Sequence, residues 1–197
     1  MNKIFLKAAR NGDINIIKQL IAEKINVNQK DDDGATALIE AAGWGRADIV
    51  ELLLENGAEV NAKEHWGATA LMYAARYDHT EIVKLLLAHG AKVNEKDKWS
   101  RTALMWAAVL GSAEVVKLLL AKGVKVNEKD KDGTTALMLA ADCDHAEVAT
   151  LLLDNGAEVN ENGVDVILKI EVSYRPLIIT CAIIFLVIIF IIIIGQL

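Results

Sequence analysis

The 197-residue sequence contains only two cysteines and one proline, and aromatic residues make up 5% of the chain. The cysteines are far apart: Cys143 lies in a polar region, whereas Cys181 lies in an apolar run near the C-terminus. Two cysteines placed in this way provide no disulfide framework, so we expect the polar region to lie in a reducing compartment.

The sequence also lacks the residue patterns of catalytic and metal sites. Its four histidines are spread along the chain without ligand spacing: His65, His79, His89 and His145. No phosphate-binding glycine loop and no nucleophile–base pair occurs at a known spacing. We therefore predict no enzyme activity, no catalytic residue, no metal site, no cofactor and no small-molecule substrate.

The chain has no strong excess of basic charge, because its formal net charge is −6. This balance offers no general reason to bind nucleic acid or an anionic membrane surface, and we predict neither. At the N-terminus, Lys7 and Arg10 interrupt any apolar stretch long enough for a signal peptide. We expect this part of the chain to stay on the side of the membrane where it was synthesised.

A repeat of 33 residues dominates residues 1–162. Four kinds of position recur at this step: Thr36, Thr69, Thr102 and Thr135; Ala41–Ala42, Ala74–Ala75, Ala107–Ala108 and Ala140–Ala141; Gly57, Gly90, Gly123 and Gly156; Asn61, Asn94, Asn127 and Asn160. A partial copy precedes them, with Ala8–Ala9 in register. We predict one domain of residues 1–162 with five repeats at about 1–30, 31–63, 64–96, 97–129 and 130–162.

Each repeat has the pattern of two short helices and a loop. In the first complete copy, Thr36 can cap a helix by accepting from the N–H groups of its first turn. Residues 48–54 then place apolar side chains at helical spacing, and Gly57 suits the left-handed residue that commonly ends a helix. One such unit cannot bury its own apolar faces, so we expect the repeats to stack into an all-α solenoid.

The segment GATALIEAAGWGRADIVELLLENGAEVNA and its three fuller copies resemble ankyrin repeats. The resemblance implies a helix-turn-helix unit plus a hairpin loop in each repeat. The chain departs from the family pattern in the turn between the helices, where Gly45 and Gly111 are kept but Asp78 and Asp144 replace glycine; aspartate tolerates a left-handed turn. The family's histidine is also replaced, and we expect apolar packing by the substitutes Ile39, Met72, Met105 and Met138.

The segment Asp142–His145 combines two aspartates, a cysteine and a histidine, a composition that suggests a metal site. However, His79 and His145 occupy equivalent turn positions, and histidine is common there in ankyrin repeats. We therefore interpret His79 and His145 as structural residues.

The resemblance also implies a concave binding surface made of loop tips and first helices. All four tryptophans fall on or beside it: Trp66 and Trp99 at loop tips, Trp44 after a first helix and Trp106 on one. Aromatic side chains dominate protein interfaces. The predicted partner-binding residues are Trp44, Trp66, Arg76, Tyr77, Lys98, Trp99, Arg101 and Trp106. The alternative is that some rings only pack between repeats, with Trp106 and Tyr73 as the strongest candidates.

The charge pattern suggests what the partner offers. Arg76, Lys96, Lys98 and Arg101 are expected beside the rings, whereas the second helices carry acidic residues on the outer side, among them Glu51. The natural partner would then be a protein that presents apolar side chains flanked by acidic ones. Aromatic and basic residues together also suit single-stranded nucleic acid, but the basic residues are too few to favour it.

Residues 177–194, LIITCAIIFLVIIFIIII, contain no charged residue. As a helix this run would extend about 27 Å, close to the thickness of a hydrocarbon core. We predict a transmembrane helix over 176–195 that crosses the membrane through 177–194. Lys169 and Arg175 precede the run and no charged residue follows it, which favours a single-pass protein with its repeats facing the cytoplasm. Because only three residues follow, we expect a tail-anchored protein.

Residues 163–175, GVDVILKIEVSYR, match no repeat. They are either a cap on the apolar end of the fifth repeat or a linker to the membrane. The leading functional hypothesis is a membrane-anchored adaptor or scaffold that binds a partner protein through its concave aromatic face. The alternative is a regulatory subunit of a membrane enzyme or transporter, in which the tail helix also makes contacts.

Overall fold

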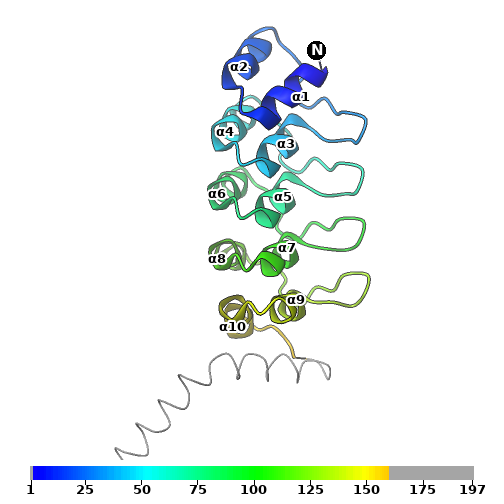
Figure 1. The fold of residues 1–197 in the computed structure, drawn as a ribbon, viewed down its shortest axis with the longest axis vertical. Coiled ribbons are helices and arrows are strands. Elements are labelled where there is room, and N and C mark those ends of the chain that lie inside the picture. The colour runs from blue at the N-terminus through cyan, green and yellow to red at the C-terminus, as the bar shows by residue number, and fades with distance from the viewer. Residues whose placement is uncertain (1, 160–197) are drawn as a thin grey trace, which may run out of the picture. The chain divides into compact units, whose positions relative to one another are not determined.

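A computed structural model of the chain describes residues 2–159, and the part up to Glu158 forms one compact unit. Its helices come in five consecutive pairs: α1 (Asn2–Asn11) and α2 (Ile14–Ala22), α3 (Ala37–Gly43) and α4 (Ala47–Glu55), α5 (Ala70–Arg76) and α6 (Thr80–Ala88), α7 (Ala103–Leu110) and α8 (Ala113–Ala121), α9 (Ala136–Asp142) and α10 (Ala146–Asp154). The first helices of the pairs stack in one row and the second helices in another (Figure 1).

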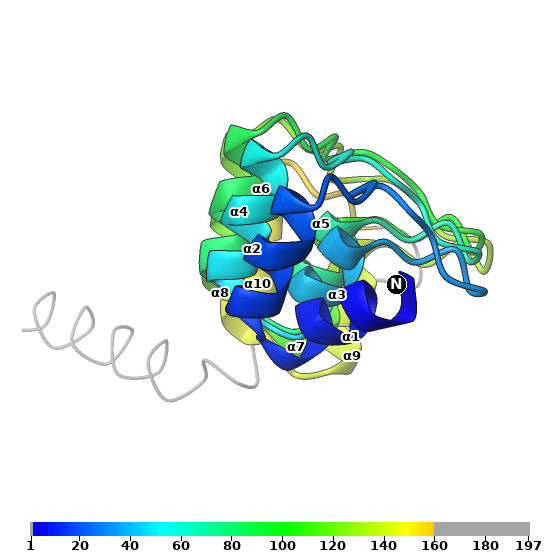
Figure 2. The ribbon, with the colours of Figure 1, turned by 90° about the horizontal axis from the view of Figure 1, so that it is seen from above.

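Long loops connect each pair to the next, and all of them project on the same side of the helices. The first helices lie between these loops and the second helices (Figure 2). Within the described residues the regular structure is helical, and the only isolated β-bridge joins Lys30 and Thr36. The predicted all-helical fold is therefore confirmed for this part of the chain.

The predicted threonine caps are present at the start of the first helices. The hydroxyl of Thr36 accepts from the N–H of Ile39 at 3.3 Å, and Thr69, Thr102 and Thr135 make the equivalent bond. All four threonines are buried, so the bond satisfies a polar group away from water. This local bond sets where each first helix begins.

The alanine pairs allow the first helices to stack closely. Every member of the four pairs is at most 3% exposed, because a methyl side chain lets neighbouring backbones approach. Ile39, Met72 and Met105, which stand where the family has histidine, are buried, as expected for apolar packing, whereas Met138 is half-buried. The core thus runs continuously between the two helix rows.

Three residues at the start of second helices reach back to the previous repeat. The Nε2 atom of His79 lies 3.2 Å from the carbonyl oxygen of Gly43, and the Nε2 atom of His145 lies 3.0 Å from that of Val109. Arg46, at the equivalent position of an earlier repeat, donates from Nε to the carbonyl of Arg10. A carbonyl oxygen only accepts, so Nε2 donates in both histidines, and the predicted structural role of these side chains is confirmed.

Among residues 2–159 no helix is long and apolar enough to cross a membrane. The predicted cap or linker at 163–175 and the predicted transmembrane helix at 176–195 lie outside the described residues.

Candidate functional site: an aromatic face on the loops and first helices

A carboxylate at the base of each loop holds the loop tip in place. These carboxylates recur every 33 residues: Asp31, Glu64, Asp97 and Asp130. Asp97 shows the arrangement, because its Oδ1 atom accepts from the N–H groups of Trp99 and Arg101, both at 2.8 Å. Glu64, Asp97 and Asp130 are buried. Charge-assisted bonds to buried carboxylates are strong, so the loop tips are rigid.

Our sequence interpretation missed this role of the carboxylates. The signal was available, because an acidic residue recurs at the same step shortly before a turn residue in every loop.

The loops are also hydrogen-bonded to one another across repeats. The N–H of Lys98 donates to the carbonyl of Trp66 at 2.8 Å, and that of Lys131 donates to the carbonyl of Trp99 at 3.0 Å. As a result Trp66 and Trp99 lie side by side, with ring centroids 5.4 Å apart and planes inclined by 23°. The two rings are nevertheless 56% and 44% exposed. They form a rigid stacked pair that still offers its outer surfaces to solvent.

Cationic side chains lie over the neighbouring rings. The guanidinium carbon of Arg76 is 4.5 Å from the ring centroid of Trp106 and 5.6 Å from that of Tyr77. The guanidinium carbon of Arg101 is 5.2 Å from the same Trp106 centroid. The Nζ atom of Lys98 lies 5.5 Å from the Trp66 ring centroid. These cation–π contacts keep positive charge next to the aromatic surface.

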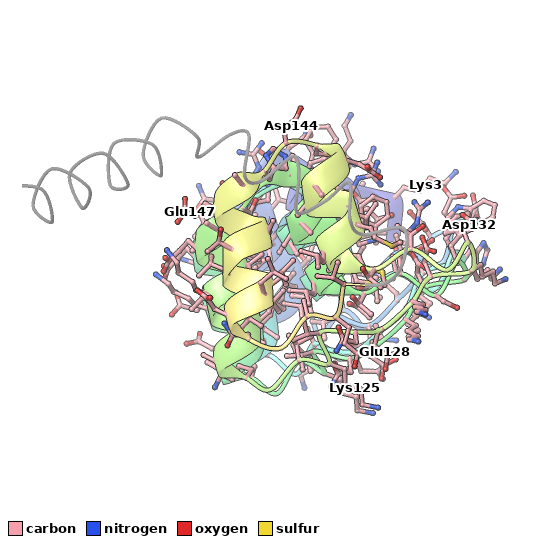
Figure 3. All side chains as sticks on the ribbon, turned by 90° about the horizontal axis from the view of Figure 1, so that it is seen from below. Lys3, Lys125, Glu128, Asp132, Asp144 and Glu147 are labelled. Carbon is pink, nitrogen blue, oxygen red and sulfur yellow. The ribbon has the colours of Figure 1, made fainter. Side chains whose placement is uncertain are left out.

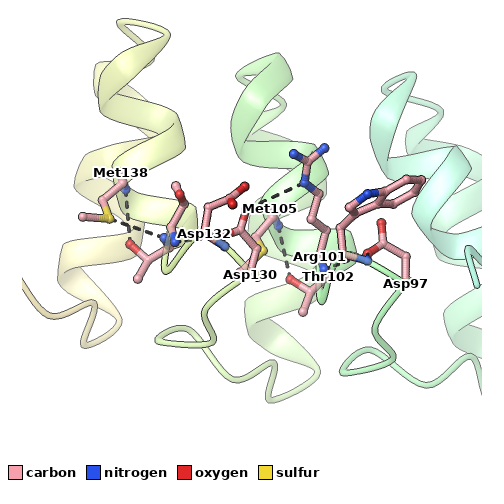
Figure 4. Close-up of polar contacts among 10 residues, drawn as sticks. Asp97, Arg101, Thr102, Met105, Asp130, Asp132 and Met138 are labelled. Atoms are coloured by element: carbon pink, nitrogen blue, oxygen red, sulfur yellow. Dashed lines mark hydrogen bonds and ion pairs between the residues drawn. The ribbon is translucent and has the colours of Figure 1, made fainter.

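Arg101 has a carboxylate partner in the next loop. Its Nε atom lies 3.7 Å from the Oδ2 atom of Asp130, a contact that Figure 4 shows beside the threonine caps of α7 and α9. The Oδ1 atom of Asp130 accepts from the N–H groups of Asp132 and Thr134, so this carboxylate is occupied on both oxygens.

A cavity of about 130 Å³ opens between the loops and the first helices. Trp66, Trp99, Trp106, Tyr73 and Arg76 contribute to its wall, and the buried carboxylates Glu64 and Asp97 lie at the same cavity. Burial raises the pKa of the Tyr73 hydroxyl above its ordinary value, and the negative charge of Glu64 raises it further. Tyr73 is therefore neutral at physiological pH, and its hydroxyl is able to donate a hydrogen bond.

A second and larger cavity, of about 620 Å³, lies next to the first along the row of first helices. Trp44 and Tyr77 line it and are 57% and 49% exposed. Arg10 and Glu40 close one side through two bonds of 2.8 Å, and the bond with Glu40 is the main reason why the pKa of Arg10 is raised. Tyr73 borders both cavities, so the two form one aromatic face.

We define the aromatic face by the residues that the structure brings together over α3, α5, α7 and the loops before them. It contains all eight residues that the sequence nominated, together with Tyr73: Trp44, Trp66, Tyr73, Arg76, Tyr77, Lys98, Trp99, Arg101 and Trp106. Trp106 and Tyr73 are half-buried, so these two also pack against neighbouring repeats, as the alternative interpretation expected.

The expectation that Lys96 belongs to this cluster is wrong. Its Nζ atom forms an ion pair with Glu128 in the next loop, in the way that Lys63 pairs with Glu95 at 2.7 Å. Neighbouring loops therefore bind each other through these lysines. Sequence proximity placed Lys96 near the rings, but its side chain points along the stack.

Other acidic side chains, unlike the buried Glu64 and Asp97, lie on elements outside the aromatic face. Glu147 lies on the second helix α10, and Asp132 lies on the distal part of the last loop (Figure 3). Glu51 and Glu55 are exposed on α4. Within residues 2–159, no group of three or more histidine, cysteine, aspartate or glutamate side chains could hold a metal ion.

We expect Asp97→Ala to lower the free energy of unfolding by about 2 kcal/mol, because two backbone N–H groups lose a charged acceptor. The loop tip should loosen, so the fluorescence emission of the Trp66–Trp99 pair should shift to longer wavelength. Asp97→Asn keeps an acceptor oxygen and should lose clearly less stability. Equal losses in the two variants, measured by urea unfolding, would show that these bonds do not hold the loop.

The described residues thus define a class of protein in which stacked helix pairs present a rigid surface of loops and first helices. A family model for ankyrin repeats in three copies matches residues 5–97 and 90–163, and the chain belongs to the ankyrin repeat family. This fold is typically a non-catalytic interaction domain, which suggests a protein–protein interaction module. No curated protein matches the chain significantly.

Proposed function

We propose that this protein is a membrane-anchored adaptor that binds a partner protein through its aromatic face. The observation that carries the proposal is the Trp66–Trp99 pair, whose rings are stacked on loops held by carboxylates and backbone bonds yet remain about half exposed. Tryptophan is enriched among the residues that dominate binding energy. A rigid aromatic surface also loses little conformational entropy on binding.

The membrane part of the proposal is supported by the sequence. The eighteen residues 177–194 include ten isoleucines and no charge, and insertion scales assign about −0.5 kcal/mol to each isoleucine at the centre of a bilayer. We propose a single-pass membrane helix there, with the repeats in the cytoplasm because Lys169 and Arg175 lie before the run. The adaptor would then hold its partner at a membrane.

We expect Trp66→Ala combined with Trp99→Ala to weaken partner binding by well over tenfold, since exposed interface tryptophans can each contribute about 2 kcal/mol or more. The array should stay folded and lose only about 1 kcal/mol of stability with the ring stack. Affinity purification of wild type and variant from detergent-solubilised membranes identifies the partner, and its affinity for each is then measured directly.

The matched control reverses charges on the outer side, at Glu51 and Glu55 of α4, and should leave partner binding nearly unchanged. If the double tryptophan variant unfolds, the rings are structural and the proposed face fails. If it folds and binds the partner as tightly as wild type, the interface lies elsewhere on the protein.

A further inference from the structure

The aromatic face contains a guanidinium group whose hydrogen-bonding edge is unused. Arg76 ends helix α5 and lies against Trp106 and Tyr77, at 4.5 Å and 5.6 Å from their ring centroids. Its side chain makes no hydrogen bond or ion pair with any other residue in the part of the chain that the structure describes. The rings orient the planar group while its N–H donors remain available.

A second guanidinium lies at the same ring. Arg101 is 5.2 Å from the Trp106 centroid, although it comes from the loop before α7 rather than from α5. Its contact with Asp130 is long, at 3.7 Å, and that carboxylate already accepts two backbone bonds. The positive charge of Arg101 is therefore only partly neutralised. The ring of Trp106 thus contacts two arginines from adjacent repeats.

The charges around this position fit a singly charged anion. Guanidinium groups bind carboxylates through two parallel N–H···O bonds, which are among the stronger hydrogen bonds in proteins. The buried carboxylates Glu64 and Asp97 lie at the same cavity. They would repel a doubly charged phosphate more strongly than a carboxylate. A cationic side chain is disfavoured as well, because Arg76 already covers the rings.

Resting on the proposed function, we propose that Arg76 and Arg101 over Trp106 bind one aspartate or glutamate side chain of the partner protein. An apolar side chain close to that acid in the partner's sequence packs on the Trp66–Trp99 pair, which borders the same cavity. The partner segment is thus acidic and apolar at neighbouring positions, and the arginine pair selects the acid.

The experiment selects random linear peptides displayed on phage against the full-length protein in detergent micelles. We expect the selected peptides to combine Asp or Glu with a nearby Trp, Phe, Leu or Ile. For a resynthesised peptide, Arg76→Gln should weaken binding by about tenfold or more, because a charge-assisted bidentate contact is lost. Changing the Asp or Glu of the peptide to Asn or Gln should weaken binding by a similar factor. The peptide change and Arg76→Gln together should weaken binding little more than either change alone.

Two variants control for charge and shape. Lys84→Gln removes one positive charge from the outer side of α6 and should change peptide affinity by less than about twofold. Arg76→Lys keeps the charge but not the planar fork, so it should restore only part of the affinity that Arg76→Gln loses. Arg76 is exposed at a helix end, and far-UV circular dichroism should show that its variants stay folded.

The outcomes separate this inference from the proposed function. If binding needs Trp66 and Trp99 but the peptides lack an acid, or Arg76→Gln changes nothing, the carboxylate site is wrong while the binding face stands. If a phosphoserine in place of the acid binds more than about tenfold tighter, the site prefers phosphate and the inference is also wrong. Selection that yields no peptide dependent on Arg76 contradicts it as well. Peptides that bind the Trp66→Ala, Trp99→Ala variant unchanged overturn the face itself.

Discussion

Gly111→Ala is expected to lower the free energy of unfolding by about 3 kcal/mol. Gly111 has a φ of 71°, where a side chain costs about 1–2 kcal/mol. A Cβ atom there would lie 2.5 Å from the Nδ1 atom of His145 and would displace the imidazole ring. The ring would then lose its bond to the carbonyl of Val109, which contributes about 1 kcal/mol more.

The same pairing recurs along the stack. Cβ atoms built at Gly12 and Gly45 would lie close to Arg46 and His79, the side chains that reach back to the previous repeat. Where the turn residue is Asp78 instead of glycine, the residue in the equivalent register is the small Ser112. The hydroxyl of Ser112 is buried and makes no such bond among the described residues. Where the turn residue is glycine, the side chain at the start of the next repeat's second helix is therefore long and bridges to the turn. Where the turn residue is Asp78, that side chain is short.

Gly123→Ala is a matched control, because Gly123 has nearly the same φ, 72°, and no atom within 4 Å of an added Cβ. It should lose only the stability due to backbone strain, so the difference between the two variants measures the His145 contact. His145→Ser should partly rescue Gly111→Ala by replacing the imidazole with a small side chain, as the small Ser112 accompanies Asp78. Urea unfolding of the full-length protein in detergent, followed by tryptophan fluorescence, measures the free energies of the wild type, the three single variants and the double variant.

If Gly111→Ala and Gly123→Ala lose equal stability, the contact with His145 has no energetic role. If the stability losses of His145→Ser and Gly111→Ala are additive in the double variant, the two positions are not coupled.

Deleting 177–197 is expected to release the protein completely from membranes. The ten isoleucines alone favour insertion by about 5 kcal/mol, and within residues 2–159 no helix is long and apolar enough to cross a membrane in place of the run. A subtler variant, Val187→Lys with Ile188→Lys, should also prevent insertion, since each lysine near the centre costs about 3 kcal/mol. Extraction of the membrane fraction with alkaline carbonate, followed by immunoblotting, measures the bound share.

The control for this pair is Val187→Leu with Ile188→Leu, which keeps the run apolar and should remain bound. Release of the wild-type protein by carbonate would contradict a spanning helix. Protease added to intact membranes should digest the repeats if they face the cytoplasm. Full protection of the repeats would contradict the proposed orientation.

The sequence predicted those parts of the fold that depend on neighbouring residues. The hydroxyl of Thr36 reaches an N–H three residues later, and Gly57 takes a positive φ of 82°, because caps and left-handed turns are local events. Asp78 and Asp144 also take positive φ values, as expected. The burial of the alanine pairs was predictable too, because a repeat at constant spacing forces equivalent residues into equivalent environments.

The sequence by itself thus determined the ankyrin fold, the helix caps and the two structural histidines of this protein. Only the tertiary structure decided that Arg76 and Arg101 share Trp106, that Lys96 pairs with Glu128 instead of the rings, and that Gly111 makes room for His145. Except for Arg101 and Trp106, which lie five residues apart in the same repeat, these contacts join residues about one repeat apart. They depend on how adjacent repeats stack and on which rotamer each long side chain adopts. Spacing along a chain sets neither quantity, because packing between repeats selects both.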